Sequence, residues 1–444
     1  MKLKDIIEKT ISGDWGNEQY LDETPCAICC VRGADIVPIE NNNFDGIPKR
    51  YVSEKSLKSR ALEVGDIVIE KSGGSPSQST GRVSYISEAL IKCKSHVLCS
   101  NFCCAIRIKK VWNPKFVYYF WKYTYSVGVF FNFEGKTSGL KNLQLDNALN
   151  SIEIPDFPKT MQDSIVETLS KIETKIALNR EINRNLEAMA RQLYDYWFVQ
   201  FDFPDENGRP YKSSGGKMVW NDKLKREIPQ GWEISLLETL ISTNRGISYN
   251  TASISGNGIP MLNLATFNID GTFKEKGLKT YSGSYSKDKV LQPMDLVMCN
   301  TQQTAIDFDK DIIGKAFLVP FCFEGDVVSS HHVTTIETKN KHLKPYLCYL
   351  SRTVHFHRYA AGCTTGTNIT GLNFTGLGKY AMELPPESVL KKFADFIENI
   401  ERRKSIIMLE ISNLLTQRDE LLPLLMNGQV SVMPPEVNCD LSHD

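Results

Sequence analysis

Two long stretches of the chain carry apolar side chains at alternating spacings of four and three residues. This spacing is typical of a coiled-coil seam, and 38 or so helical residues span about 57 Å. Every position of the second seam lies 228 residues after its counterpart in the first. We therefore predict two equivalent long helices that pack antiparallel. The seams are Ile165, Leu169, Ile172, Ile176, Asn179, Asn183, Leu186, Ala190, Leu193 and Trp197, and Phe393, Ile397, Ile400, Lys404, Ile407, Ile411, Leu414, Arg418, Leu421 and Leu425.

Polar residues interrupt both seams. Asn179 and Asn183 lie on the first seam, where a buried amide costs stability but sets the helix register. Lys404 and Arg418 lie on the second seam. Two arrangements would accommodate them: their alkyl chains snorkel toward solvent, or their charges pair with acids of the partner helix.

The ends of the two helices carry start and stop signals. Thr160 and Asp163 have the spacing of a capping box, and Ser388 is predicted to cap the second helix. Pro423 predicts a kink near the end of the second helix, and Gly428 predicts a left-handed stop.

The segments that precede the helices also resemble each other. A period this long indicates two globular domains rather than a solenoid. The matching pairs are Leu62–Ile69 with Leu291–Met298, Gly81–Ile86 with Gly314–Val319, and Lys2–Asp5 and Gly13 with Ser235–Glu238 and Gly246. In the first copy, apolar runs predict strands at 27–31, 66–69, 82–86, 104–108 and 152–155, and an aromatic run predicts a helix at 115–125.

These patterns predict an α+β fold: two pseudo-symmetric α/β globular domains separated by two long antiparallel coiled-coil helices. Two similar but non-identical domains on a rigid spacer suggest a protein that reads a two-part target. The predicted boundaries are a first globular domain at 1–157, a first helix at 158–200, a linker at 201–230, a second globular domain at 231–386, a second helix at 387–428 and a C-terminal tail at 429–444.

Charge narrows the possible functions. The 52 basic and 52 acidic residues balance, which argues against a protein that coats nucleic acid through overall positive charge. A local excess nevertheless predicts nucleic-acid contact, although lysines that only solubilise an aromatic segment would explain it as well. The excess consists of Arg107, Lys109, Lys110, Lys115, Lys122, Lys136 and Lys141 against the single acid Glu134.

The chain is expected to be cytoplasmic and to lack a membrane span. Met1 opens on a charged amphipathic turn rather than a secretory signal, and no run of about 18 apolar residues occurs. The 12 cysteines are then expected to be reduced thiols. Cys26 and Cys29 have the spacing of half a zinc site, but the second copy has no matching cysteines, so no metal is expected.

No catalytic constellation stands out in the sequence. The sequence contains neither the Gly-x-x-x-x-Gly-Lys-Ser/Thr loop that binds nucleotide triphosphates nor a Gly-x-Gly-x-x-Gly motif after a strand. Asn113-Pro114 resembles a base-binding motif of amino-methyltransferases, but the motif's second proline is missing, and the matching Pro345 suggests a proline-started helix. His331 and His332 would point to opposite faces of a strand, so they are not expected to share a metal. The sequence indicates a binding protein rather than an enzyme.

The best contact candidates are polar loops that recur at matching places in both copies but differ in chemistry. Lys, Asn and Gln side chains can hydrogen-bond to base edges, while Ser, Thr and backbone amides suit phosphates. Ordinary surface turns remain the alternative for any single residue. The candidates are Lys71, Ser72, Gly73, Gly74, Ser75, Lys136, Thr137, Ser138, Lys141 and Asn142 in the first copy, and Asn300, Thr301, Gln302, Gln303, Thr304, Thr364, Thr365, Thr367 and Asn368 in the second.

The segment between the copies resembles a known family. The run Leu193–Pro204, the following Ser213–Met218 and the opening Ile228–Glu233 of the second copy are similar to the specificity (S) subunits of type I restriction-modification enzymes. The first copy lacks the Pro-x-Gly-Trp opening and begins at Lys2, so its first strand is expected to be shorter.

The resemblance implies that the two globular domains are target recognition domains that bind double-stranded DNA. It also implies assembly with two modification (methyltransferase) subunits, which carry S-adenosylmethionine and methylate adenine. Two restriction subunits, which use ATP and magnesium to translocate and cut DNA, would complete the complex. The chain itself is then expected to be noncatalytic and to bind no cofactor. A coiled-coil adaptor with two protein-binding heads is the alternative from another functional class.

Overall fold

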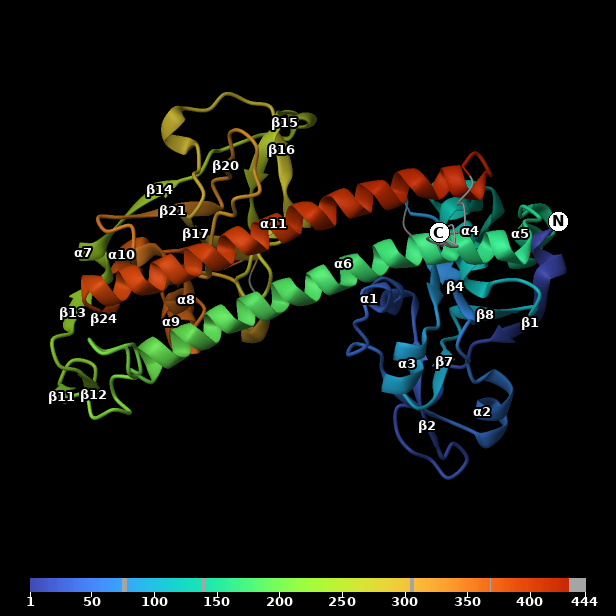
Figure 1. The fold of residues 1–444 in the computed structure, drawn as a ribbon, viewed down its shortest axis with the longest axis horizontal. Coiled ribbons are helices and arrows are strands. Elements are labelled where there is room, and N and C mark those ends of the chain that lie inside the picture. Colours follow the sequence, from blue (N-terminus) through green and yellow to red (C-terminus); the bar gives the residue numbers. More distant parts are fainter. Residues whose placement is uncertain (74–77, 138–139, 304–306, 368, 431–444) are drawn as a thin grey trace, which may run out of the picture. The chain divides into compact units, whose positions relative to one another are not determined.

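The computed structural model describes residues 1–73, 78–137, 140–303, 307–367 and 369–430 (Figure 1). The chain divides into two compact units. Unit 1 comprises Met1–Leu178 and the segment from Ser412 onward, and unit 2 comprises Asn179–Ile411. Each unit therefore contains part of both long helices.

The two long helices are α6 (Lys159–Tyr194), which a π-helical turn at Asp195–Val199 continues, and α11 (Glu387–Met426). In unit 2, the Asn179 side-chain amide donates to the Glu410 carboxylate at 2.8 Å, and the Lys404 ammonium donates to Glu187 at 2.5 Å. Because the α11 partner number falls as the α6 number rises, the helices are antiparallel, as predicted. Lys404 is paired with an acid of the partner helix, which decides between the two arrangements expected for it.

The predicted start signals of both helices are wrong by two residues. Thr160 and Ser388 lie inside the first turns, because α6 begins at Lys159 and α11 at Glu387. The carbonyls of Pro158 and Pro386 accept the first helical hydrogen bonds instead. Gly428 has a φ of 67°, so the predicted left-handed stop after α11 is confirmed.

Unit 1 is built from three sheets (Figure 1). The central sheet is antiparallel, in the order β1 (Ile7–Ser12), β8 (Cys103–Ile108), β4 (Ile67–Glu70), β6 (Val83–Tyr85). The second sheet has the order β3 (Lys49–Val52), β2 (Cys26–Val31), β7 (Val97–Cys99), and its strands β2 and β7 are parallel. The third sheet has the order β5 (Ser72–Gly73), β10 (Leu140–Leu143), β9 (Glu134–Thr137). Its shorter helices are α1 (Ile36–Glu40), α2 (Glu54–Arg60), α3 (Glu88–Cys93), α4 (Pro114–Ser126) and α5 (Leu145–Ser151).

Unit 2 repeats these three sheets in the same order. The central sheet has the order β14 (Ile241–Arg245), β21 (Val333–Thr338), β17 (Leu296–Cys299), β19 (Ala316–Leu318). The second sheet has the order β16 (Lys279–Tyr281), β15 (Ile254–Leu262), β20 (Val328–Ser329), and its strands β15 and β20 are parallel. The third sheet has the order β18 (Thr301–Gln303), β23 (Ile369–Leu372), β22 (Thr364–Thr365). Two two-stranded sheets complete the unit: the hairpin of β11 (Met218–Asn221) with β12 (Arg226–Pro229), and β13 (Glu233–Leu236) with the distant β24 (Ala381–Leu384). Its shorter helices are α7 (Leu237–Leu240), α8 (Leu343–Ser351), α9 (Val354–Gly362) and α10 (Phe374–Gly378).

The repeated glycines show why the two copies keep the same residues. A Cβ on Gly13 would lie 1.9 Å from the Ser100 carbonyl oxygen, and a Cβ on Gly246 would lie 2.2 Å from that of Ser330. Only glycine allows the backbones to approach this closely. The same crossing in both units, together with the matching sheet orders, confirms the predicted α+β fold with a duplicated scaffold.

Two local expectations change. The strand predicted at 152–155 is reduced to a single bridge between Lys2 and Glu153, whereas its counterpart β24 pairs with four residues of β13. The predicted linker at 201–230 contains the β11–β12 hairpin and buries Phe201 and Phe203 in the core of unit 2. The domain boundaries themselves stay predictions.

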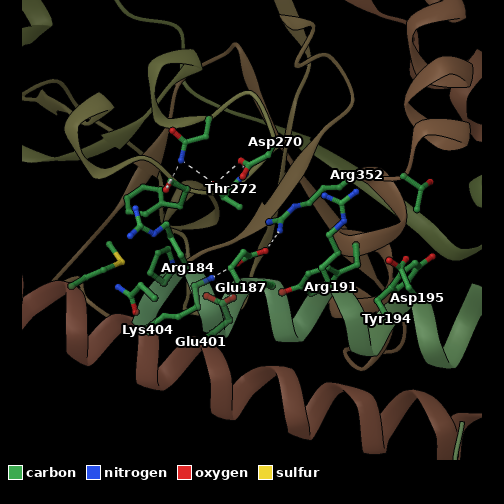
Figure 2. A pocket seen from close by; sticks show the side chains of 18 of the residues that line it. Arg184, Glu187, Arg191, Tyr194, Asp195, Asp270, Thr272, Arg352, Glu401 and Lys404 are labelled. Atoms are coloured by element: carbon green, nitrogen blue, oxygen red, sulfur yellow. Dashed lines mark hydrogen bonds and ion pairs between the residues drawn. The ribbon is translucent and has the colours of Figure 1, made fainter. Parts of the chain in front are cut away.

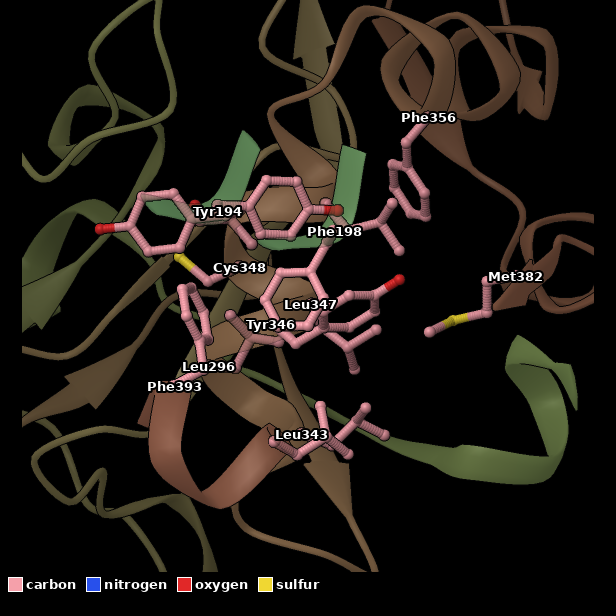
Figure 3. Close-up of a cluster of buried hydrophobic side chains, with 14 of the residues drawn as sticks. Tyr194, Phe198, Leu296, Leu343, Tyr346, Leu347, Cys348, Phe356, Met382 and Phe393 are labelled. Carbon is pink, nitrogen blue, oxygen red and sulfur yellow. Dashed lines mark hydrogen bonds between the residues drawn. The ribbon is translucent and has the colours of Figure 1, made fainter. Parts of the chain in front are cut away.

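Aromatic side chains join the long helices to the core of unit 2 (Figure 3). The Phe198 ring lies 4.9 Å from that of Phe393 on α11 and 4.8 Å from that of Tyr346 on α8. Burying one such ring contributes about 1.5–3 kcal/mol. In unit 1, α4 buries Trp121, whose ring stacks on Phe130 at 4.8 Å. The helix ends are therefore parts of the domain cores.

Candidate nucleic-acid interface

In unit 1, the two predicted contact loops meet in the third sheet. Strand β5 pairs with β10, so that Ser72 faces Asn142 and Gly73 faces Lys141. The Ser72 hydroxyl donates to the Asn142 side-chain oxygen. Loops about 70 residues apart in sequence therefore form one surface. Of the remaining candidates, Gly74, Ser75 and Ser138 lie outside the described residues, and only the backbones of Lys136 and Thr137 are described.

The two lysines of this surface have different surroundings. The Lys141 ammonium lies 3.0 Å from the Glu134 carboxylate, which also accepts from the Thr80 backbone amide at 2.7 Å. Lys71 is half-buried, and its ammonium has no hydrogen-bond or ion-pair partner among the described residues. Among the described lysine side chains of this surface, Lys71 is thus the cation that is available to an anionic ligand.

In unit 2, the equivalent loops meet in the equivalent sheet. Thr301 faces Gly371 and Gln302 faces Thr370 across β18 and β23, and β22 adds Thr364 and Thr365 on the other side of β23. Thr304 and Asn368 lie outside the described residues, and only the backbone of Gln303 is described.

Two of the candidates in unit 2 hold the loop in place. Asn300 is buried and donates to the His331 carbonyl at 3.1 Å and to the Thr334 hydroxyl at 2.6 Å. Gln302 is also buried, and its side-chain oxygen accepts from the Ile312 backbone amide at 2.9 Å. Thr365 and Thr367 are exposed. The exposed part of this sheet is therefore rich in hydroxyl groups, unlike the amide and ammonium groups of unit 1.

The basic segment at 107–141 does not form the positive patch that its composition suggests. Acids neutralise at least four of its seven cations, because the fold brings carboxylates from other elements against them. The pairs are Arg107 with Asp66 at 2.8 Å, Lys115 with Glu173 at 3.5 Å, Lys122 with Glu40 at 3.3 Å and Lys141 with Glu134 at 3.0 Å. Much of the positive charge of this segment is thus neutralised by ion pairs within unit 1.

The structure also changes the interpretation of the adjacent histidines. His331 and His332 lie on a turn before β21, not in a strand, and their ring centroids are 3.8 Å apart. Within the described ranges, no three His, Cys, Asp or Glu residues are grouped so that they could hold a metal ion. Asn113 caps α4 by accepting from the Lys115 and Phe116 amides, so the proline-started helix predicted there is confirmed.

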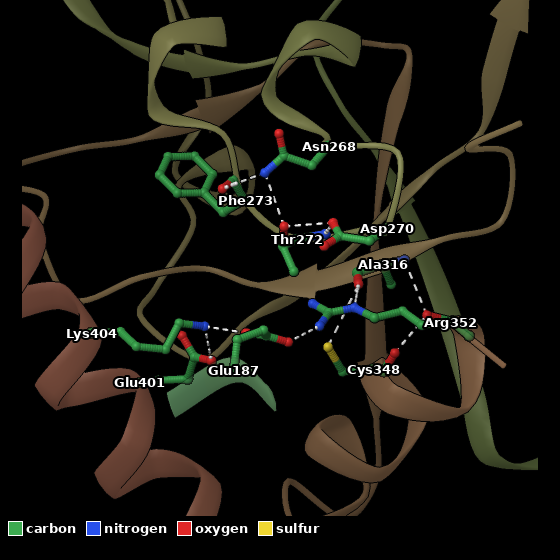
Figure 4. A network of polar contacts seen from close by, with 11 residues as sticks. Glu187, Asn268, Asp270, Thr272, Phe273, Ala316, Cys348, Arg352, Glu401 and Lys404 are labelled. Atoms are coloured by element: carbon green, nitrogen blue, oxygen red, sulfur yellow. Dashed lines mark hydrogen bonds and ion pairs between the residues drawn. The ribbon is translucent and has the colours of Figure 1, made fainter. Parts of the chain in front are cut away.

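A cavity of about 770 Å³ lies inside unit 2, where α6, α8 and α11 meet the 268–275 segment (Figure 2). An ionic network forms part of its wall (Figure 4). The Glu187 carboxylate accepts from Arg352, directly after α8, at 2.6 Å and from Lys404 of α11 at 2.5 Å. Lys404 also donates to Glu401 at 2.8 Å. One carboxylate of α6 therefore ties the globular part of unit 2 to both long helices.

The electrostatics of Glu187 follow from its two cationic partners. Burial alone would raise the pKa of this carboxyl group, but Arg352 and Lys404 outweigh burial and lower the pKa to about 2. For Lys404, burial opposes the charged form, yet Glu401 and Glu187 raise the pKa above its ordinary value. The network therefore stays ionised across the neutral range.

Comparisons with known proteins match this chain to DNA-specificity proteins. Residues 31–188 match the family model described as "Type I restriction modification DNA specificity domain". The chain is 23% identical over 293 residues to the "Type I restriction enzyme MjaIX specificity subunit" of Methanocaldococcus jannaschii, covering 64% of this chain and 62% of that protein. It is 42% identical over 52 residues to the HindI specificity subunit of Haemophilus influenzae, covering 12% and 11%. The predicted resemblance to type I specificity subunits is confirmed.

The aligned parts span less than two-thirds of the length of either relative. A crystal structure of the type I restriction-modification system S subunit from M. genitalium has the same fold. It matches with a TM-score of 0.53 at 15% identity and covers 96% of this chain and 95% of its own. As a further finding, no helix among the described residues is both long and apolar enough to cross a membrane.

Two charged residues that anchor this scaffold were not predicted from the sequence. Glu187 lies beside the apolar seam rather than on it, and Arg352 lies between two short helices. The available signal was Lys404, for which an acid on the partner helix was one of the two arrangements expected.

Proposed function

We propose that the chain is a noncatalytic DNA sequence-specificity subunit of a type I restriction-modification enzyme, and that each unit reads one half of an asymmetric, bipartite DNA target. One observation carries the proposal: the two units have the same three sheets in the same order, but different chemistry on the third sheet. The match of residues 31–188 to a DNA specificity domain supports it.

The asymmetry of the target follows from the contact loops. Lys71 and Asn142 of unit 1 offer an ammonium group and an amide, groups that hydrogen-bond to base edges. Thr301, Thr365 and Thr367 of unit 2 offer hydroxyl groups, which bond to phosphates and to either kind of base edge. Identical readers would bind a palindrome, whereas different readers on one scaffold require two different half-sites.

The long helices fit a second role, as a ruler and as the docking surface for two modification subunits. In unit 2, large apolar side chains remain exposed on them: Ile182 and Met189 of α6 and Ile406 and Leu409 of α11. Exposed apolar groups of this kind mark protein contacts. The two restriction subunits would join the same complex. S-adenosylmethionine, ATP and magnesium belong to those partners.

A mobility-shift assay with the full chain tests the proposal. A duplex with the genomic target and a scrambled duplex of equal length are compared at a stated salt concentration, with the modification subunit present. We expect the target to be bound at least about 10³-fold more tightly. Equal binding of both duplexes, or none, would favour the protein-binding adaptor and contradict the proposal.

A further inference from the structure

Each unit has a short turn directly before the strand in the middle of its central sheet. We call it the pre-strand turn: residues 100–102 before β8, and residues 330–332 before β21. The first residue of each turn is the serine against which Gly13 or Gly246 packs. The last residue of each turn bonds to the first predicted contact loop. Lys71 donates its backbone amide to the Phe102 carbonyl at 2.8 Å, and Asn300 donates to that of His332 at 3.1 Å.

In unit 1, this turn presents an aromatic ring. Phe102 is 59% exposed, although large apolar side chains are usually buried. A single exposed ring needs no explanation by itself, but this ring is on the residue whose carbonyl accepts from both Lys71 and Ser72. The backbone of Phe102 is therefore fixed to the start of the contact sheet, and its exposed ring projects from that point.

In unit 2, the same turn presents two imidazole rings. The rings of His331 and His332 lie 3.8 Å apart, and His332 Nδ1 lies 3.1 Å from the hydroxyl of Thr301 on the contact sheet. His331 Nδ1 is buried and has no hydrogen-bond partner in the described part of the chain. The Tyr249 ring lies next to this pair, 5.7 Å from that of His331 and tilted by 52°.

Basic groups surround this histidine pair. Arg245 donates from Nε to the His331 carbonyl at 3.0 Å, and the Lys279 ammonium lies 3.2 Å from the Tyr249 hydroxyl. The charged groups that act on His332 are His331, Arg245 and Lys279, and none of them is acidic. Neither Arg245 nor Lys279 forms an ion pair with a described residue. Positive charge that the protein leaves uncompensated is suited to an anionic ligand.

We propose that the pre-strand turn is a DNA-contact element in both units: Phe102 stacks on a base in unit 1, and His331 and His332 stack on a base in unit 2 while Arg245 and Lys279 bind an adjacent phosphate. This inference rests on the proposed function. Aromatic and imidazole rings stack on bases of any sequence, and cations bind phosphates, so the chemistry matches nucleic acid. Like the contact loops, the turns occupy equivalent places in the two units but differ in chemistry.

Three variants of the full chain test the inference, each assayed with its modification subunit on duplexes of the methylated motif. Phe102→Ala and the double variant His331→Ala, His332→Ala should each weaken DNA binding by roughly tenfold, because a lost base stack costs about this much. Phe102→Ala should relax the sequence preference at the half-site that unit 1 reads, and the histidine variant should relax it at the half-site that unit 2 reads. The double variant Arg245→Gln, Lys279→Gln should leave the recognised motif unchanged. The slope of the logarithm of the binding constant against the logarithm of the salt concentration should become shallower, by the contribution of about one to two phosphate contacts.

Matched controls separate a DNA contact from a folding effect. Val111→Ala removes another exposed apolar side chain, 71% exposed, at the other end of β8, and His355→Ala removes an exposed histidine of α9. Both should bind like the wild type, and Phe102→Tyr should restore stacking. Wild-type affinity, motif and salt slope in all three variants would overturn the inference. A wild-type chain that shows no sequence preference would instead overturn the proposed function.

Discussion

Units 1 and 2 differ at the place where α4 or α8 meets the long helices. In unit 2, Arg352, directly after α8, and Lys404 of α11 share the Glu187 carboxylate in a largely buried ionic network. In unit 1, Glu173 of α6 accepts from the Tyr119 hydroxyl of α4 at 2.6 Å beside a cavity of about 490 Å³, and its cation, the more exposed Lys115, lies 3.5 Å away. Both junctions sit on the same repeated scaffold.

This difference separates what duplication preserves from what it leaves free. The sheet order, the parallel strand pair and the glycine crossings are the same in both units, because backbone geometry admits few alternatives there. The junctions, the contact loops and the pre-strand turns differ, because any side chains that satisfy one another can fill those places. Under the proposed function, this freedom is what lets one scaffold read two different half-sites.

The largest effect is expected when one globular domain is exchanged. Replacing residues 1–157 with the same domain of a relative should change one half of the methylated motif and leave the other half unchanged, because distant sites contribute nearly independently. Sequencing of methylated adenines in cells that express the chimera gives the result. A change in both halves would mean that the units do not read DNA separately.

The ionic junction predicts a large stability effect in unit 2. Glu187→Gln leaves Arg352 and Lys404 with reduced compensation and should destabilise unit 2 by about 3–5 kcal/mol. The matched Glu173→Gln in unit 1 keeps a group that can accept from Tyr119 and should cost about 1 kcal/mol. Urea unfolding, with hydrogen exchange to assign the loss to a unit, measures both. Equal losses would contradict the contrast between the junctions.

The same network predicts a pH dependence. Folding lowers the pKa of Glu187 from 4.5 to about 2, so its contribution to stability is fully present above pH 4.5 and is lost as the pH falls toward 2. The melting temperature of unit 2 should therefore decline over this window in the wild type and decline less in Glu187→Gln. Parallel curves for the two proteins would show that the network does not supply the effect.

The shared scaffold predicts a smaller and equal effect in both units. Gly13→Ala and Gly246→Ala each force a Cβ against a carbonyl oxygen and should each cost about 1–3 kcal/mol. Gly46→Ala and Gly256→Ala are suitable controls, since a Cβ there would meet nothing within 4 Å. Thermal unfolding measures all four. A large loss in one unit only would mean that the crossings are not equivalent.

The smallest effects concern the polar seam. Asn179 donates to Glu410, whereas the buried side-chain oxygen of Asn183 has no partner in the described part of the chain. Asn183→Leu should therefore be neutral or stabilising by about 1 kcal/mol, and Asn179→Leu should still fold but loosen the helix register. The gap between the half-sites of the methylated motif reports the register. A gap that stays strictly constant in the double variant would show that the pair does not set it.

The sequence predicted the helices and strands of this fold better than it predicted which of them lie against one another. Periodicity located both long helices, and the helix at 115–125 and four of the five strands predicted in the first copy appeared where aromatic and apolar runs placed them. The repeat also placed the predicted contact loops at equivalent positions of the two units, as their matching third sheets show. These features depend on local side-chain patterns, which a single sequence displays directly.

Contacts between distant residues could not be predicted in the same way. The pairing of Ser72 with Asn142 and the meeting of Glu187 with Arg352 depend on how the chain folds back on itself. The turn at His331 and His332 was mistaken for a strand because it directly precedes the apolar run of β21. The ion pairs of the 107–141 segment could not be predicted either, since acids such as Asp66 and Glu173 come from distant parts of the sequence.

The most direct test of the central claim is the motif itself. Methylated adenines are mapped by sequencing in cells that express this chain with its modification subunit, and in cells that lack only this chain. We predict one motif that depends on the chain and consists of two different half-sites separated by a gap of constant length. A palindromic or continuous motif, or a motif that persists without the chain, would contradict the account.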